Sequence, residues 1–174
     1  MEAYIKEVLI TEEQIRDRVA ELGLELSRDY ASKNPVIVGV LKGVVVFYAD
    51  MIRQIKVPCQ MDFMWISSYS GTQSSGMIVR KDVTVDLKGR HVVILEDIFD
   101  TGNSLQFAYN HLMEKEPASL EICTLLDKLQ KVSALQQHLL LLRLLRGCRD
   151  RTNLLQHHSN LNCILLLKVR EVAC

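Results

Sequence analysis

Apolar and polar positions near the start of the chain recur with the spacing of a helix. Four apolar residues follow one another at intervals of three and four: Ile15, Val19, Leu22 and Leu26. This spacing places them on one face of an amphipathic helix. Thr11, with Gln14 three positions later, has the pattern of a capping box. The sequence therefore predicts a helix that begins after Thr11 and ends near Tyr30.

Further along, the apolar residues form short uninterrupted runs, which are typical of strands buried on both faces of a parallel sheet. These runs are VIVGVL (36–41), CQMDFMWISSYS (59–70), HVVILEDI (91–98) and SLEICTLLDK (119–128). Helical patterns follow the first and third runs, as VVVFYADMIRQI (44–55) and SLQFAYNHLMEK (104–115). The alternating segment MIVRKDVTV (77–85) is predicted to pair back as a hairpin arm. This order predicts an α/β fold with a mostly parallel central sheet flanked by helices.

The segment GTQSSG, residues 71–76, has no large apolar side chain to pack. It is predicted to be part of a mobile loop near residues 69–77. In open parallel sheets, ligands bind beyond the carboxyl ends of the strands. Lys42, the predicted loop, the polar residues from 96 to 104 and Lys128 all fall at that edge. The ligand site is therefore expected there.

Composition indicates a single cytoplasmic domain. The 174 residues are 48% hydrophobic and have a formal net charge of zero. The sequence has no run of 18 apolar residues, so we expect no membrane span. It also has no basic start followed by an apolar stretch, so we expect no signal peptide. The five cysteines include no CxxC pair, which favours reduced thiols over a disulfide framework. We expect neither a membrane nor a nucleic acid as a partner.

The character of the sequence changes near residue 129. Residues 1–128 hold 14 Lys and Arg against 19 Asp and Glu, whereas residues 129–174 hold 7 against 2. The second segment also has 14 leucines and no aromatic residue. We therefore expect a core at 1–128 and a Leu- and Arg-rich tail at 129–174 that is helical in part. The basic tail leaves contact with RNA or an acidic partner as an alternative, while the spacing of its histidines and cysteines fits no common zinc site.

The stretch VVILEDIFDTGNSL, residues 92–105, carries the clearest chemistry. A buried run ends in Glu96 and Asp97, and Asp100 precedes a small, hydroxyl-rich turn before a helix. Free backbone N–H groups and the helix dipole make such a turn an anion site. Adjacent carboxylates can accept hydrogen bonds from a ribose diol, directly or through a hydrated Mg²⁺. The stretch has neither a Walker nor a GxGxxG pattern, and it predicts a site for ribose 5-phosphate.

The same stretch closely resembles the phosphoribosyl pyrophosphate signature of the purine phosphoribosyltransferases. VLKG (40–43), DFMWISSYSG (62–71) and ICTLLDK (122–128) resemble the hypoxanthine-guanine branch in the same order and spacing. The resemblance runs from about Tyr4 to Lys128. It implies a type I phosphoribosyltransferase fold and a Mg²⁺-dependent enzyme of purine salvage. Such an enzyme transfers phosphoribosyl from phosphoribosyl pyrophosphate to hypoxanthine and guanine, and it is a homo-oligomer, either a dimer or a tetramer.

The resemblance also implies roles for residues at the sugar and phosphate end of the site. Asp100 would be the catalytic general base near N7 of the purine. Glu96 and Asp97 would hold the ribose hydroxyls and, with water, Mg²⁺. The 5-phosphate would be cradled beside Asp100 by four residues: Thr101, Gly102, Asn103 and Ser104.

Other matching positions imply the rest of the site. Lys42 and Gly43 would bind pyrophosphate, in a turn whose Leu41–Lys42 peptide bond is typically cis in this family. Ser68 and Tyr69 would lie on the mobile loop that closes over the reacting atoms. Lys128 would donate a hydrogen bond to the exocyclic oxygen of hypoxanthine or guanine.

The resemblance stops after Lys128. There the family supplies a stacking aromatic residue, an aspartate for a second metal and an arginine near pyrophosphate. Residues 129–174 contain no aromatic residue, and the surroundings of Asp150 and of the arginines from Arg143 to Arg151 match nothing in the family. The tail is either a divergent replacement or the product of a different reading frame. The alternative function is accordingly a non-catalytic protein that binds phosphoribosyl pyrophosphate or a nucleotide.

Overall fold

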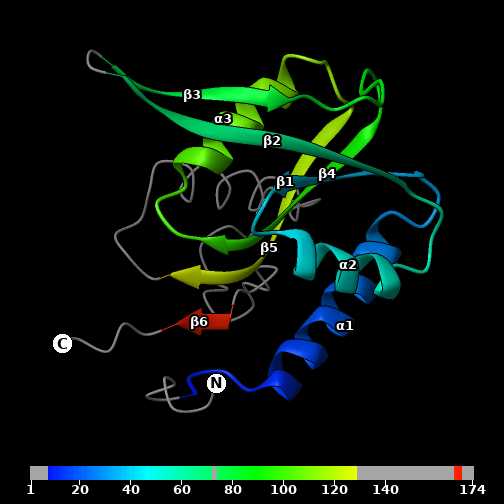
Figure 1. The fold of residues 1–174 in the computed structure, drawn as a ribbon. Coiled ribbons are helices and arrows are strands. Elements are labelled where there is room, and N and C mark those ends of the chain that lie inside the picture. The colour runs from blue at the N-terminus through cyan, green and yellow to red at the C-terminus, as the bar shows by residue number, and fades with distance from the viewer. Residues whose placement is uncertain (1–7, 72–73, 129–166, 170–174) are drawn as a thin grey trace, which may run out of the picture.

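The computed structural model describes residues 8–71, 74–128 and 167–169, and it contains a six-stranded sheet in the order β3-β2-β1-β4-β5-β6 (Figure 1). All neighbouring strands pair in parallel except β2 and β3, which are antiparallel. In chain order the elements are α1 (Glu12–Asp29), β1 (Val36–Leu41), α2 (Val45–Gln54), β2 (Gln60–Gly71), β3 (Ser74–Lys81), β4 (His91–Phe99), α3 (Asn103–Met113), β5 (Ser119–Lys128) and β6 (Leu167–Val169). The predicted α/β class and its mostly parallel sheet are confirmed.

Helices cover both faces of the sheet, which explains why the parallel strands are apolar without interruption. On β4, Val92 and Ile94 pack in one buried cluster with residues of α3. Val93 and Leu95 point the other way and join a second buried cluster with α1 and α2. Because successive residues of a strand face opposite sides, each of the two clusters takes every second residue. The two helical layers fix the position of β4, whose carboxyl end carries the predicted acids.

Helix α1 begins and ends where its sequence predicts. The Gln14 N–H donates to Thr11 Oγ1 at 3.2 Å, and the Thr11 N–H donates to Gln14 Oε1 at 2.8 Å. These reciprocal bonds satisfy two of the backbone donors that a helix leaves open at its first turn. The helix ends at Asp29, with Tyr30 as its C-cap.

Strands β2 and β3 form a long hairpin at one edge of the sheet (Figure 1). The last residue of β1, Leu41, pairs with Trp65, whereas β2 continues to Gly71. The hairpin therefore extends past the carboxyl end of β1. The predicted loop at 69–77 is wrong as a secondary-structure assignment, because Gly71 pairs with Ser74 and strands occupy all of this range outside residues 72–73. Backbone hydrogen bonds between antiparallel strands do not require the apolar side chains that this stretch lacks.

A buried carboxylate fixes the base of the hairpin. Asp62, only 6% exposed, accepts hydrogen bonds from the N–H groups of Thr84 and Val85 at 2.6 and 2.8 Å. Burial opposes the charge, but hydrogen bonds from Val85, Phe63 and Thr84 outweigh it and lower the pKa of Asp62. The segment that follows β3 is thereby tied back to β2.

The described part of the predicted tail is a strand. β6 extends the sheet by pairing with the end of β5, where Leu167 lies opposite Leu126. The prediction that the tail is helical in part stays untested, because residues 129–166 and 170–174 lie outside the described residues. Among the helices that the structure describes, none is both long and apolar enough to cross a membrane.

Candidate active site

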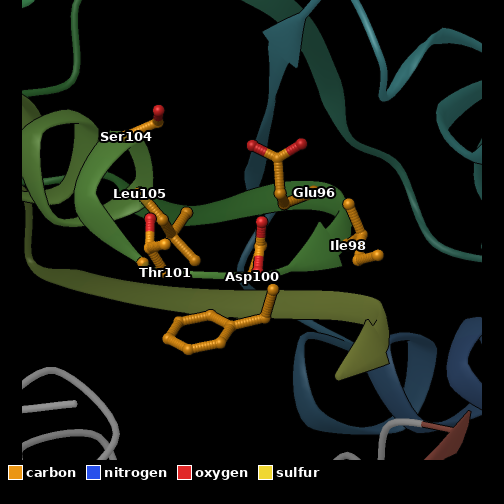
Figure 2. A pocket seen from close by; sticks show the side chains of 8 residues that line it. Glu96, Ile98, Asp100, Thr101, Ser104 and Leu105 are labelled. Carbon is orange, nitrogen blue, oxygen red and sulfur yellow. The ribbon is translucent and has the colours of Figure 1, made fainter. Parts of the chain in front are cut away.

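The carboxyl end of β4, the turn after it and the start of α3 enclose a pocket of about 240 Å³. Figure 2 shows that four oxygen-bearing side chains point to the same side of this turn: Glu96, Asp100, Thr101 and Ser104. Apolar residues complete the lining, namely Ile98, Phe99 and Leu105. The pocket thus offers carboxylate and hydroxyl oxygens beside an apolar wall, a combination typical of small-molecule sites.

The backbone of the turn depends on Gly102, which has a φ of 78° and is the N-cap of α3. A Cβ at this position would lie 2.8 Å from Cζ of Phe99, so any other residue would both strain the backbone and collide with the ring. In the part of the chain that the structure describes, no side chain caps this end of α3. The first N–H groups of α3, together with the exposed hydroxyls of Thr101 and Ser104, are arranged to bind an anion.

Glu96 is the most perturbed acid of the pocket. Burial, a side-chain hydrogen bond with Asp97 and the nearby charge of Asp97 raise the pKa of Glu96 to about 8. At neutral pH Glu96 in the unliganded protein therefore holds a proton and lies in a hydrogen bond with Asp97. A cation or a diol that binds both groups would replace this hydrogen bond.

The turn after β1 meets these acids. A Cβ on Gly43 would lie 3.0 Å from Oδ2 and 3.1 Å from Oδ1 of Asp97, so the carboxylate lies directly against the Gly43 backbone. The peptide bond between Leu41 and Lys42 is cis, as the family resemblance implies. Residues that are more than 50 positions apart are thus brought together at one edge of the sheet, in agreement with the sequence prediction.

The Lys42 side chain is exposed, and its Nζ lies 5.1 Å from the centroid of the Trp65 ring on β2. This distance is within the range of a cation–π interaction. The register between β1 and β2, which pairs Leu41 with Trp65, brings the two side chains together.

Comparison with known proteins decides the family. The phosphoribosyl transferase domain family matches residues 9–141, which is more than half of the chain. This chain is a member of the phosphoribosyltransferase family. It is 48% identical over 130 residues to the hypoxanthine-guanine phosphoribosyltransferase of Streptococcus pneumoniae, and the alignment covers 74% of this chain and 72% of that protein.

Solved structures support the same family. The hypoxanthine phosphoribosyltransferase of Staphylococcus aureus is similar with a TM-score of 0.70 and 40% identity, over 76% of this chain and 74% of that one. The enzyme of Trypanosoma cruzi, in a variant solved with the product IMP, is similar with a TM-score of 0.66 and 38% identity, over 72% of this chain and 69% of that one. The predicted family and fold are therefore confirmed.

The acids of this phosphoribosyltransferase suit a metal that is shared with a ligand. Within residues 8–71, 74–128 and 167–169, no three metal-binding side chains form a ready-made site. Glu96 and Asp97 nevertheless provide adjacent hard oxygen donors beside the pocket. Mg²⁺ is commonly held by one or two carboxylates together with substrate oxygens and water. The two residues therefore fit Mg²⁺ in the presence of a phosphate-bearing ligand.

The remaining predicted residues lie on β2, which neighbours β1, and on β5, which neighbours the pocket strand β4. Ser68 is exposed and, like Tyr69, lies on the part of β2 that extends beyond β1. Lys128 ends β5, one residue after the pair formed by Phe99 and Asp127. The backbones thus reach the expected edge of the sheet, and the roles of all three side chains stay predictions.

Sequence reasoning missed the apolar lining of the pocket and the contact of Trp65. Ile98 is 40% exposed although four consecutive residues earlier in the same strand are buried, and Phe99 packs against Gly102. Ile98 and Phe99 lie between Asp97 and Asp100 in the sequence, and this position could have indicated that both line the pocket. Trp65 had no such signal, because its contact with Lys42 depends on the register of two strands.

Proposed function

We propose that this phosphoribosyltransferase transfers the 5-phosphoribosyl group from phosphoribosyl pyrophosphate to hypoxanthine and guanine, giving IMP or GMP and pyrophosphate in purine salvage. The observation that carries the proposal is the contact between the Gly43 turn and Asp97. It joins a phosphate-binding turn to a second turn that bears a lysine, as a substrate with phosphates at both ends of a sugar requires. The names of the similar enzymes support the same substrates.

At the sugar end, the first N–H groups of α3 and the hydroxyls of Thr101 and Ser104 hold the 5-phosphate. Glu96 and Asp97 accept hydrogen bonds from the ribose hydroxyls. Gly102 allows the backbone to approach the phosphate oxygens closely. These contacts fix C1 of the ribose in front of the base, and fixed orientation is itself a large part of catalysis in a two-substrate reaction.

At the reacting centre, a ring nitrogen of the purine attacks C1 of the ribose, and the bond from C1 to the pyrophosphate oxygen breaks. The electron pair of that bond leaves with pyrophosphate. Asp100 accepts a proton from the purine, and a positioned general base of this kind contributes about 10²–10⁴-fold to a rate. Lys42 and the Gly43 backbone lie at the leaving group, where negative charge grows.

Magnesium dependence is part of the proposal. Glu96 and Asp97 would hold Mg²⁺ together with water and the substrate. When bound, Mg²⁺ supplies positive charge to the ribose and pyrophosphate oxygens and stabilises the leaving group. The residues' own contribution is to present two ionised carboxylates, which requires Glu96 to lose its proton on binding.

The purine would lie against the exposed side chain of Ile98. Lys128 at the end of β5 would donate a hydrogen bond to the exocyclic oxygen of hypoxanthine or guanine. Adenine has an amino group at this position, so a donor there disfavours it.

The setting of the activity is proposed to be the cytoplasm, in a homo-oligomer. Val45 and Val46 of α2 are 50% and 73% exposed, and they offer an apolar surface for a second copy. Light scattering of the purified protein would show a dimer or a tetramer if the proposal holds, and a monomer at all concentrations would contradict it.

The test is nucleotide formation by the purified chain with phosphoribosyl pyrophosphate and hypoxanthine, guanine or adenine, with Mg²⁺ or with a chelator. Formation of IMP and GMP only when Mg²⁺ is present supports the enzyme. If no product forms but phosphoribosyl pyrophosphate still raises the melting temperature, the chain is the alternative, a non-catalytic binding protein. No product and no shift in melting temperature would contradict both.

A further inference from the structure

Trp65 is the only tryptophan of the chain, and it faces the single lysine of the turn after β1. Its ring is 38% exposed, which is unusual for the largest apolar side chain on a strand of the central sheet. The register between β2 and β3 shifts between Trp65 and Ile66, and such irregularities redirect side chains. Neither packing in a core nor the strand pattern accounts for the ring at this position.

The cation–π interaction between Lys42 and Trp65 has a property that an ion pair would lack. Among the described residues, no ion pair joins Lys42 to a carboxylate, although Asp97 at the end of β4 lies against the next residue, Gly43. A carboxylate partner would occupy the N–H donors of the ammonium and neutralise its charge. An aromatic face attracts the cation but accepts none of its conventional hydrogen bonds, so the three N–H donors stay available to an anion.

The position of Lys42 indicates which anion this is. The next residue, Gly43, lies against the carboxylate of Asp97, and Asp97 follows the pocket residue Glu96. We propose that Trp65 is a positioning residue, whose ring holds the Lys42 ammonium toward the pyrophosphate of the substrate. This inference rests on the proposed function, because that function assigns pyrophosphate to the Lys42 turn.

A positioning role has a kinetic consequence that a structural role lacks. A free lysine side chain samples many rotamers and loses this freedom when it binds an anion. If the ring has already restricted these rotamers, binding of the pyrophosphate end is favoured, while binding of the purine is unchanged. An exposed cation–π interaction of ordinary strength corresponds to about a two- to five-fold change in affinity.

The experiment compares Trp65→Leu, which removes the ring, with Trp65→Phe, which retains an aromatic face. Trp65→Leu is expected to raise the KM for phosphoribosyl pyrophosphate and the Kd for pyrophosphate about two- to five-fold, with the KM for hypoxanthine unchanged. Trp65→Phe should recover most of the loss. Met61→Ala, which truncates another exposed apolar residue of β2, is the matched control and should change neither constant. Equal constants for the wild type and Trp65→Leu, or an equal rise in both KM values, would overturn the proposal.

The fluorescence of this single tryptophan gives a readout that does not depend on turnover. Titration with pyrophosphate and Mg²⁺ should change the emission of the wild type, because the anion binds the ammonium that lies on the ring and so changes the electric field at the indole. In Lys42→Met the change should be lost. If the wild type forms no nucleotide but shows this Lys42-dependent change, the proposed function fails and the positioning role stands. If nucleotide forms but pyrophosphate binds, by calorimetry, without changing the emission, the positioning role fails alone.

Discussion

Two turns at the same edge of the sheet form the site, and they are built differently. Each follows a buried parallel strand and leads into a helix, from β1 into α2 and from β4 into α3. The turn after β4 carries its ligand groups within a few consecutive residues and is shaped by Gly102. The turn after β1 has one charged residue, Lys42, whose surroundings are Trp65 from β2 and, through Gly43, Asp97 from β4.

The two turns show two ways to build a binding site: from residues that are adjacent in the sequence, or from residues that only the folded sheet brings together. Glycine, hydroxyls and acids at fixed offsets are sufficient to specify an anion-binding turn at the start of a helix. The turn after β1 has a lysine but no acidic or aromatic residue beside it in the sequence. Residues of other strands of the sheet must therefore hold this lysine in position. We therefore expect changes in the turn after β4 to act directly, and changes in the turn after β1 to act through the residues that it contacts.

Replacement of Asp100 tests the chemistry of the turn after β4 and has the largest expected effect. Asp100→Asn keeps the shape but removes the proposed base, so kcat should fall by about 10²–10⁴-fold, while the affinity for phosphoribosyl pyrophosphate changes little. Steady-state kinetics and calorimetry would measure the two. Asp17→Asn, on the exposed surface of α1, is the control. An unchanged kcat in Asp100→Asn would remove Asp100 from the mechanism.

Gly102 tests the shape of the same turn. Gly102→Ala places a methyl group 2.8 Å from the Phe99 ring at a φ of 78°. The backbone strain costs about 1–3 kcal/mol of unfolding free energy, and the turn should lose phosphate affinity as well. Gly89→Ala is the matched control, because Gly89 has a φ of 68° and a Cβ added there would meet nothing within 4 Å.

Urea unfolding and ribose 5-phosphate binding would compare the two variants. Both should lose stability through strain, but only Gly102→Ala should lose ligand affinity. Equal affinity in the two variants would mean that the turn after β4 does not need its observed shape.

Gly43 tests whether the turn after β1 acts through Asp97. In Gly43→Ala the new methyl group would lie 3.0 Å from the Asp97 carboxylate, which must move by a few tenths of an ångström. We expect about a tenfold loss of affinity for phosphoribosyl pyrophosphate with Mg²⁺, and little change in melting temperature. Gly89→Ala, where an added Cβ would meet nothing within 4 Å, is the control and should bind normally. Normal binding in Gly43→Ala would separate the two turns functionally.

The pH dependence of stability tests the environment of Glu96 rather than the binding of a ligand. Its pKa is raised from 4.5 to about 8, so between these values the folded protein holds a proton that the unfolded chain has released. The contribution of Glu96 to the free energy of unfolding therefore falls as the pH rises from about 4.5 to about 8. Melting curves of the unliganded protein should show a smaller decline over this range in Glu96→Gln. The exposed Glu114→Gln is the control, and identical pH profiles of wild type and Glu96→Gln would contradict the assignment.

Hydrophobic periodicity was sufficient to predict the helices and strands up to Lys128, apart from the hairpin's second arm: this was predicted over 77–85, whereas β3 is Ser74–Lys81 and the N–H groups of Thr84 and Val85 donate to Asp62. The capping box of α1 and the apolar runs of β1 and β4 contain the necessary information locally. Prediction from the sequence failed at residues 69–77, where Gly and Ser indicated a loop but backbone pairing extends the hairpin. The tail had no pattern from which β6 could be predicted, because parallel pairing with β5 depends on contacts distant in the sequence.

The residues of the candidate site could be predicted from the sequence, but the pKa shift and the side-chain contact found there could not. The acids, the glycine and the hydroxyls of the turn after β4 are adjacent in the sequence, so their cooperation could be read from it. The raised pKa of Glu96 depends on burial, and the Lys42–Trp65 contact depends on strand register. Both are properties of the folded sheet.

The central claim is that the two turns bind opposite ends of one ligand. Competition binding tests it most directly: ribose 5-phosphate and pyrophosphate are each bound to the purified chain with Mg²⁺, and phosphoribosyl pyrophosphate is then added. The account predicts that phosphoribosyl pyrophosphate displaces both ligands and binds more tightly than either. If one of them stays bound at saturating phosphoribosyl pyrophosphate, the two turns belong to separate sites and the account is wrong.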